Sequence, residues 1–153
     1  MPLSAPLESD PLRPTARARG PLVLIIEDTT DLRDLFAAEL ATDGFLVIDA
    51  ADGETGIEKA RRFEPDGIVL DLMLPGITGF EVARALRSDE RTRNAAIVAV
   101  TALTSQRHRS MALDAGCDAF LSKPVLGAAV VAELLPLLVK RRAAVDMSRV
   151  NKD

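Results

Sequence analysis

The chain of 153 residues contains no tryptophan, no tyrosine, one cysteine and one histidine. A single cysteine excludes a disulfide framework and a cysteine-rich zinc site, and the lone His108 excludes any site that needs two histidines. Five phenylalanines leave no aromatic platform for stacking single-stranded nucleic acid. No apolar run approaches the ~20 residues of a membrane span, and no secretory signal opens the chain. These absences predict a cytoplasmic protein without membrane insertion.

Charge is distributed unevenly along the chain. Between Leu22 and Lys140 there are 12 basic and 19 acidic residues, a net charge of −7, whereas the flanks carry 7 basic and 4 acidic residues, a net charge of +3. An acidic body disfavours binding to nucleic acid phosphates. A composition of 48% hydrophobic and 27% charged residues is typical of one globular domain at this length.

The composition divides the chain into three parts. Residues 1–20 are rich in proline, lack periodicity and are predicted to be a disordered extension. Residues 21–140 are predicted to form the folded domain, and residues 141–153 a polar tail. Pro136 is expected to kink the last helix or to end it near Leu135.

The folded part alternates between apolar runs of strand length and helical patterns. The runs are rich in Val, Ile and Leu without polar alternation, which is typical of strands buried on both faces of a parallel sheet. They are Leu22–Ile26, Phe45–Ile48, Gly67–Leu70, Ala96–Val100 and Ala119–Leu121. Five strands alternating with five helices predict an α/β fold, a flavodoxin-like doubly wound (βα)5 domain whose parallel sheet has the order 2-1-3-4-5.

Capping residues mark the predicted helix boundaries. Asp52 and Ser105 are placed to begin the second and fourth helices, and Thr78–Glu81 is a capping box for the third. Gly44 and Gly116 are placed to end the first and fourth helices.

Polar residues follow four of the predicted strands. The first strand ends in Glu27-Asp28, the third in Asp71 and the fourth in Thr101, and the fifth is followed by Lys123. In an open parallel sheet, ligands bind beyond the carboxyl ends of the strands, where the strand order reverses. The sequence therefore predicts that three carboxylates, one hydroxyl and one ammonium meet at one edge.

Three carboxylates this close repel one another unless a cation or a proton lies among them. Oxygen ligands of this kind suit Mg²⁺, which keeps several waters, and Lys123 offsets part of the charge. A metal, an ammonium and a hydroxyl around a carboxylate nucleophile are suited to phosphoryl transfer. We therefore expect Mg²⁺-dependent phosphoryl chemistry at this edge.

Four segments agree in order and spacing with a known family. They are LVLIIEDT (Leu22–Thr29), IVLDLMLPGITGFE (Ile68–Glu81), AVTA (Ala99–Ala102) and DAFLSKPV (Asp118–Val125). On these segments the chain resembles a response-regulator receiver domain of two-component signalling. The resemblance implies a phosphorelay protein that accepts a phosphoryl group from a histidine kinase or a histidine phosphotransfer protein.

The resemblance implies a role for each acidic residue. Asp71 would be the phosphoacceptor. Mg²⁺ would be held by Asp28 directly, by Glu27 through water, by Asp71 and by the backbone carbonyl of Met73.

It also implies the phosphoryl-binding and switch residues. Thr101 would bond a phosphoryl oxygen and act as the switch hydroxyl beside the small Ala102, and Lys123 would pair with another phosphoryl oxygen. Phe120 matches the aromatic switch position and would turn inward on phosphorylation. Pro124 matches the proline whose peptide bond is usually cis in this family, fixing the Lys123 loop.

The same resemblance places the partners. The histidine-bearing protein would dock on the first helix, with Asp31 and Arg33 as candidate contacts, and on the loop Pro124–Leu126. A downstream protein target, or a second copy in a homodimer, would use the fourth helix, the fifth strand and the fifth helix. Since the chain after Lys140 is too short for an output domain, a stand-alone receiver without direct nucleic-acid binding is expected.

Two alternatives stay open. A receiver-like scaffold that is never phosphorylated would usually have lost an acidic or switch residue, and this chain retains all of them. A Mg²⁺-dependent aspartyl phosphohydrolase would need an acid/base residue two positions after Asp71, where Met73 cannot transfer a proton. The protein is therefore expected not to be an enzyme, beyond assisting its own phosphorylation and dephosphorylation.

Overall fold

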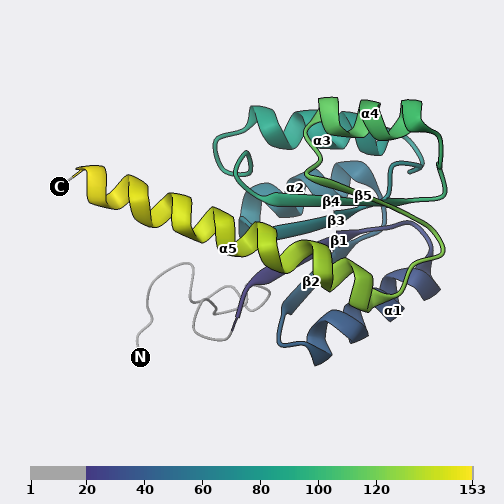
Figure 1. Ribbon diagram of the computed structural model, residues 1–153. Coiled ribbons are helices and arrows are strands. Elements are labelled where there is room, and N and C mark those ends of the chain that lie inside the picture. The colour runs from purple at the N-terminus through teal and green to yellow at the C-terminus, as the bar shows by residue number, and fades with distance from the viewer. Residues whose placement is uncertain (1–19, 153) are drawn as a thin grey trace.

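The computed structural model describes residues 20–152, which form a single five-stranded parallel sheet with five helices (Figure 1). The strands are β1 (Leu22–Ile26), β2 (Leu46–Ala50), β3 (Gly67–Leu70), β4 (Ala96–Thr101) and β5 (Ala119–Ser122). The helices are α1 (Thr30–Thr42), α2 (Gly53–Phe63), α3 (Gly79–Ser88), α4 (Gln106–Ala115) and α5 (Gly127–Lys152). The order β2-β1-β3-β4-β5 confirms the predicted fold. The predicted N-terminal extension, apart from Gly20, lies outside the described residues.

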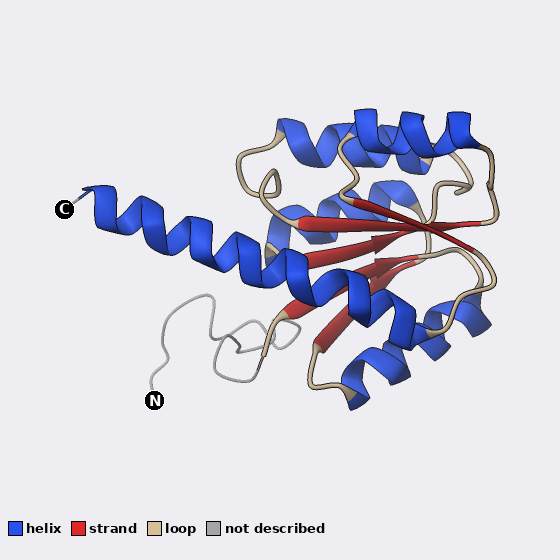
Figure 2. Cartoon of the chain, in the orientation of Figure 1, coloured by secondary structure: helices blue, strands red, loops and turns tan. Residues whose placement is uncertain are grey.

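The sheet lies between two layers of helices (Figure 2). One core cluster joins it to α1 and α5, and a second joins its other face to α2, α3 and α4. The central strands β1, β3 and β4 are buried along their whole length, whereas the edge strands β2 and β5 are partly exposed. The continuous apolar runs of the central strands therefore agree with the burial of these strands on both faces.

The predicted capping residues lie at helix ends. The side chains of Asp52, Thr78 and Ser105 accept hydrogen bonds from the N–H groups of Thr55, Glu81 and His108, at 2.8, 3.2 and 3.1 Å. Gly116 ends α4 in the left-handed conformation, with φ of 117°, which only glycine adopts without strain.

β2 begins and ends later than predicted. It spans Leu46–Ala50 rather than Phe45–Ile48, because its ladder with β1 continues to the pair Ile26 and Ala50. The ring of Phe45 packs in the core just before the strand.

α5 continues through Pro136. Of the two predicted outcomes, a kink or an end near Leu135, the end near Leu135 is therefore wrong. Proline removes one backbone hydrogen bond from a helix. Packing on both sides compensates for this loss, because Leu134 is fully buried before the proline and Leu137 and Leu138 pack against the same cluster after it.

The segment predicted as a polar tail is the end of α5, and Arg141 anchors it to the sheet. The Arg141 guanidinium donates to the carboxylate of Asp66 at 3.0 Å and to the carbonyl of Asn94 at 2.7 Å. Asp66 in turn accepts the N–H of Leu22 at 2.9 Å. Beyond this anchor the helix projects away from the sheet (Figure 1, yellow). Within residues 20–152, none of the helices combines the length and apolar composition needed to cross a bilayer.

Candidate functional site

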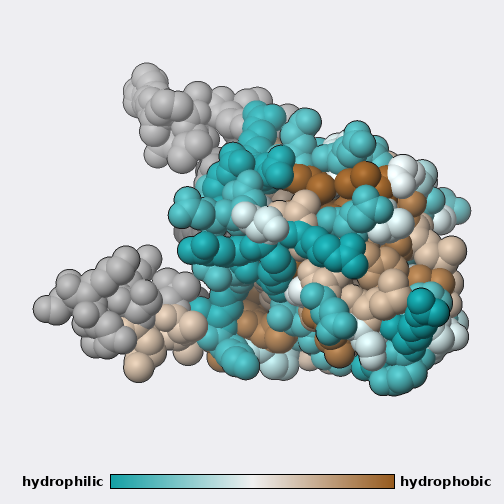
Figure 3. All heavy atoms as spheres, turned by 90° about the horizontal axis from the view of Figure 1, so that it is seen from above, coloured by the Kyte–Doolittle hydropathy of each residue, from teal (hydrophilic) through white to brown (hydrophobic). Residues whose placement is uncertain are grey.

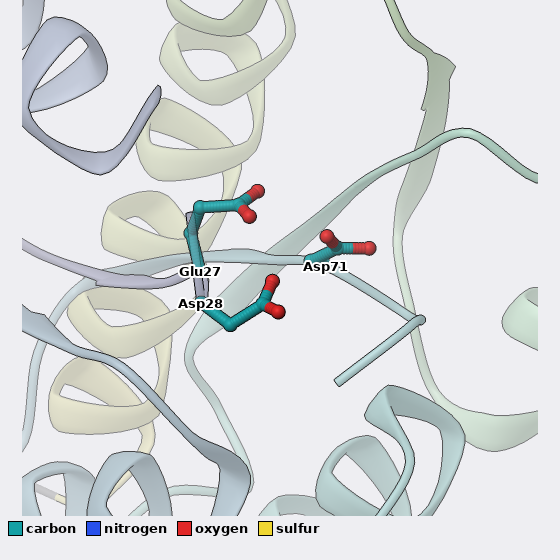
Figure 4. Close-up of side chains that lie close together, drawn as sticks. All are labelled: Glu27, Asp28 and Asp71. Carbon is teal, nitrogen blue, oxygen red and sulfur yellow. The ribbon is translucent and has the colours of Figure 1, made fainter. Parts of the chain in front are cut away.

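The structure brings the three predicted acids together. Glu27 and Asp28 follow β1 and Asp71 follows β3, the neighbouring parallel strand. Their carboxylate oxygens lie within 4.8 Å of one another (Figure 4). Glu27 and Asp71 are buried, at 2% and 5% exposure, whereas Asp28 is exposed.

Lys123 joins the two buried acids. Its Nζ donates to Glu27 Oε1 at 2.8 Å and to Asp71 Oδ2 at 2.9 Å. Its backbone N–H donates to the carbonyl of Thr101 at 2.8 Å, which ties the loop after β5 to the end of β4. The peptide bond between Lys123 and Pro124 is cis, as the resemblance implied.

Backbone donors complete the hydrogen bonding of the buried acids. The N–H of Thr29 donates to Glu27 Oε2 at 3.1 Å, and the N–H of Met73 donates to Asp71 Oδ1 at 2.9 Å. Each of the four oxygens of Glu27 and Asp71 therefore accepts a hydrogen bond, which holds both carboxylates in one orientation.

The buried charges alter the pKa values of two groups. Burial raises the pKa of Glu27, and the neighbouring Asp71 carboxylate adds to the rise, against the lowering effect of hydrogen bonds from Lys123 and the Thr29 N–H. Burial alone would lower the pKa of Lys123, but hydrogen bonds to Asp71 and Glu27 outweigh it and raise that pKa. The site thus favours a charged ammonium and has an excess of negative charge.

The predicted switch residues lie on or beside β4 and β5: Thr101 is the last residue of β4, Ala102 follows it, and Phe120 is the second residue of β5. Thr101 is fully buried, and its hydroxyl accepts the N–H of Leu103 at 3.3 Å, while Ala102 is exposed. Phe120 is 6% exposed and packs in the cluster shared with α4. The ring, which was expected to turn inward on phosphorylation, is already buried in this structure.

Arg33 contributes to the site in a way that the sequence analysis missed. Its guanidinium donates to the carbonyl of Glu27 at 2.8 Å and pairs with Asp49 at 3.5 Å. We expected Arg33 to face a partner, but it connects α1 to the loop that carries Glu27 and Asp28. The signal available in the sequence was an arginine six residues after Glu27.

Gly79 was also overlooked. Its N–H donates to the carbonyl of Leu72 at 3.0 Å, and a Cβ at this position would collide with the carbonyl of Asp71. The capping box predicted the start of α3 from Thr78 and Glu81. It did not predict that α3 begins directly against the loop after β3, where only glycine fits at position 79.

The donor set fits a divalent cation. Three carboxylates face one ammonium, and the pKa of Glu27 is raised, so the site has more negative charge than its own cation neutralises. Carboxylate oxygens are the hard ligands that Mg²⁺ prefers. Glu27, Asp28 and Asp71 are the residues that would hold it.

Residues 23–135 match the family model for the response regulator receiver domain. The chain belongs to this family. This receiver is 37% identical over 123 residues, 80% of its length, to hybrid signal transduction histidine kinase D of Dictyostelium discoideum. It is 40% identical over 104 residues, 68% of its length, to the DNA-binding dual master transcriptional regulator RpaA of Synechocystis. It spans 8% of the first relative and 43% of the second.

Other relatives are nearer in size. The receiver is 33% identical over 103 residues, 67% of its length, to the polar-differentiation response regulator DivK of Brucella ovis, of which the match covers 84%. It is 31% identical, with a TM-score of 0.72, to the receiver domain of a sensor histidine kinase from Pseudomonas aeruginosa, whose structure has a magnesium ion coordinated in its active site cleft. That match covers 78% of this chain and 98% of the other.

Membership in the family establishes the general role. The chain contains a receiver domain of two-component signalling, and such domains interact with histidine kinases and phosphotransfer proteins and bind Mg²⁺ at an acidic pocket.

Proposed function

We propose that this receiver accepts a phosphoryl group on Asp71 from a histidine kinase or a histidine phosphotransfer protein, in a Mg²⁺-dependent reaction. The observation that carries the proposal is the arrangement around Asp71. This buried carboxylate is held by Lys123 and the Met73 N–H and lies beside the acids Glu27 and Asp28. We further propose a cytoplasmic location, where ATP-dependent kinases supply phosphohistidine.

The proposed transfer uses the Asp71 carboxylate as the nucleophile. An Asp71 oxygen forms a bond to the phosphorus of a phosphohistidine, the bond from phosphorus to the imidazole nitrogen breaks, and the imidazole leaves with the electron pair. The Lys123 ammonium, already 2.9 Å from Asp71 Oδ2, pairs with a phosphoryl oxygen. Glu27, Asp28, Asp71 and the Met73 carbonyl would hold Mg²⁺, which would supply positive charge to the phosphoryl oxygens.

The proposed switch uses the end of β4 and the neighbouring strand β5. The Thr101 hydroxyl exchanges its hydrogen bond from Leu103 for one to a phosphoryl oxygen, and the small Ala102 leaves room for that group. Since Thr101 and Phe120 lie on paired strands, the change is passed to the surface of α4, β5 and α5.

We propose that the histidine-bearing partner docks on α1 and the loop before α5. Leu35 on α1 and Leu126 in the loop are large apolar side chains with 49% and 72% exposure. Gly127 lies directly against Glu39 of α1, so the two segments are neighbours. An apolar surface beside the acidic site suits a helical partner that presents its histidine to Asp71.

Output is proposed to occur through protein contacts of α4, β5 and α5, with a downstream protein or with a second copy of the chain. Leu113 on α4 and Leu135 on α5 are 46% and 48% exposed. The likeness to DivK, of which the match covers 84%, supports the proposal of a single-domain regulator. The net negative charge between Leu22 and Lys140 supports the proposal that it does not bind nucleic acid directly.

We propose no enzymatic activity beyond the receiver's own phosphorylation and dephosphorylation. The residue two positions after Asp71 is Met73, whose thioether cannot act as the acid/base residue of an aspartyl phosphohydrolase.

Incubation with acetyl phosphate, with and without Mg²⁺, tests the proposal when intact mass is recorded. We expect the mass of one phosphoryl group only with Mg²⁺, and no modification of Asp71→Asn. Asp114→Asn is the matched control, because Asp114 is an exposed acid of α4 outside the site and should leave modification unchanged. Equal modification of the wild type and Asp71→Asn would refute the assignment.

A second arm tests docking. Leu126→Glu should slow phosphotransfer from the phosphorylated partner about tenfold or more, since a hot-spot contact contributes about 2 kcal/mol. It should leave modification by acetyl phosphate unchanged, because a small donor needs no docking surface. A wild-type protein that neither donor modifies would support the scaffold alternative.

A further inference from the structure

Arg109 of α4 lies over the ring of Phe120 of β5. Its guanidinium carbon is 5.3 Å from the centroid of the Phe120 ring, and its Nη2 is 3.5 Å from the Phe120 carbonyl. One side chain of α4 therefore contacts both the ring and the backbone of one residue of β5.

Phe120 is also part of an apolar core cluster. The ring belongs to a cluster with Ala99 of β4 and Ala112 of α4, and Leu103 and Met111 pack against the same cluster. Arg109 is exposed, so it covers this cluster from the solvent side. The face seen from above in Figure 3, which carries α3 and α4, is mixed, with hydrophilic areas and apolar areas side by side.

Phe120 is well placed to affect the acidic site. In the β4–β5 ladder it pairs with Ala99, and two residues further the pair is Thr101 and Ser122. The next residue is Lys123, whose Nζ contacts Glu27 and Asp71. β5 therefore leads from Phe120 directly into Lys123.

We propose that Arg109 is a positioning residue that holds Phe120 in its buried position and thereby sets the resting conformation of β5 next to Lys123. The inference rests on the proposed function, since it concerns the regulation of the same site. A cation over an aromatic face stabilises the pair and disfavours the outward ring position, in which the contact is lost. A contact of this type shifts the ratio of buried to outward rings about two- to fivefold.

Substitutions of Arg109 remove different parts of its two contacts with Phe120. Arg109→Gln removes the charge and the planar guanidinium, and Arg109→Met keeps only the aliphatic stem. Arg109→Lys keeps a cation on a flexible chain and should retain part of the effect. Arg107→Gln is the matched control, because it removes the same charge from an exposed position of α4.

Fluorine NMR of the full chain labelled with fluorophenylalanine tests the proposal. The Phe120→Leu variant assigns the Phe120 signal, and broadening by a soluble nitroxide measures exposure of the ring. We expect about two- to fivefold more broadening of that signal in Arg109→Gln and Arg109→Met, an intermediate value in Arg109→Lys and the wild-type value in Arg107→Gln. The signals of Phe36, Phe45, Phe63 and Phe80 report whether each variant is folded.

Spectra recorded with beryllofluoride and Mg²⁺ test the positioning role of Arg109 independently of the proposed function. Addition should return the ring of Arg109→Gln to the buried position, because it mimics the phosphorylated state. If beryllofluoride changes no signal in the wild type while Arg109→Gln still exposes Phe120, the proposed function fails and the positioning role stands. If the Phe120 signal stays as protected in folded Arg109→Gln or Arg109→Met as in the wild type, Arg109 does not position the ring.

Discussion

The three acids of the site differ in their surroundings. Glu27 and Asp71 are buried, and each of their oxygens accepts a hydrogen bond from Lys123 or a backbone N–H. Asp28 is exposed. Two acids are therefore part of the folded core of the site, whereas Asp28 can be removed without leaving a buried partner unpaired.

We expect Asp28→Ala to remove most of the stabilisation by Mg²⁺ while leaving the metal-free protein at least as stable as the wild type. The substitution deletes a ligand and also relieves repulsion among the carboxylates. In the wild type, Mg²⁺ at about 100 times its dissociation constant raises the free energy of unfolding by about 2.7 kcal/mol. Thermal unfolding with and without Mg²⁺ measures both effects.

Asp34→Ala is the control, since Asp34 is an exposed acid of α1. It should keep the full response to Mg²⁺. A response of Asp28→Ala equal to that of the wild type would show that Asp28 does not bind the metal.

Cys117 is the only thiol of the chain, and it is buried beyond the end of α4. Burial raises its pKa from 9.0 to about 12. Because the unfolded chain ionises first, the thiol's contribution to stability is complete below pH 9.0 and is lost as the pH rises toward 12. At neutral pH the thiol is uncharged and shielded, so it is part of the core and not a reactive group.

We expect iodoacetamide to alkylate Cys117 in the folded protein about a hundredfold or more slowly than in the urea-unfolded chain, because reaction requires local opening. Mass spectrometry measures the rate. Above pH 9.0 the wild type should lose stability faster than Cys117→Ala. Similar rates in folded and unfolded chains would mean that the thiol is accessible.

At the scale of the element, α5 shows that packing can override a local preference. Pro136 is exposed and lies inside the helix, between apolar residues that contact the core on either side. Its ring contributes little packing, while its missing N–H leaves the helix one hydrogen bond short.

We expect Pro136→Ala to raise the free energy of unfolding by about 1–3 kcal/mol, because alanine restores the hydrogen bond and has the highest helix propensity. Urea unfolding followed by circular dichroism measures the change. Lys140→Ala, at an exposed position of the same helix, should change stability by less than about 0.5 kcal/mol. A less stable Pro136→Ala would mean that the proline ring makes a contact that the helix needs.

In the whole molecule, the carboxyl ends and the amino ends of the strands have different roles. The carboxyl ends of the strands carry the acids and Lys123, and the opposite edge carries a network around Arg87. The Arg87 guanidinium donates to the carbonyls of Gly116, Arg93 and Ala95 at 2.9, 2.7 and 2.6 Å and to Asp118 at 2.9 Å. These bonds join α3 to the loop before β4 and to the end of α4.

We expect Arg87→Ala to lower the free energy of unfolding by about 2–3 kcal/mol, since it leaves three carbonyls and a carboxylate without their charged donor. The rate of modification by acetyl phosphate should stay within about twofold of the wild type at a temperature where the variant is folded. Arg84→Ala, an exposed arginine of α3, is the control for both measurements. A large fall in rate would show that the two edges are coupled.

Much of this arrangement could be predicted because its signals are local. The strands appear as apolar runs, the caps as Asp52, Thr78 and Ser105, and the site as polar residues that follow the strands. Arg33, Arg87 and Arg141 could not be predicted, because their long side chains reach carbonyls and carboxylates that only the fold brings near.

The family and the strand order could be predicted from local sequence patterns. The meeting of Glu27, Asp28, Asp71 and Lys123 could be predicted too, because parallel strands of one sheet end at a common edge. The burial of Glu27 and Asp71, the passage of α5 through Pro136 and the contact of Arg109 with Phe120 became clear from the three-dimensional fold alone. Burial and long-range contacts depend on distances across the whole molecule, which no local pattern of residues specifies.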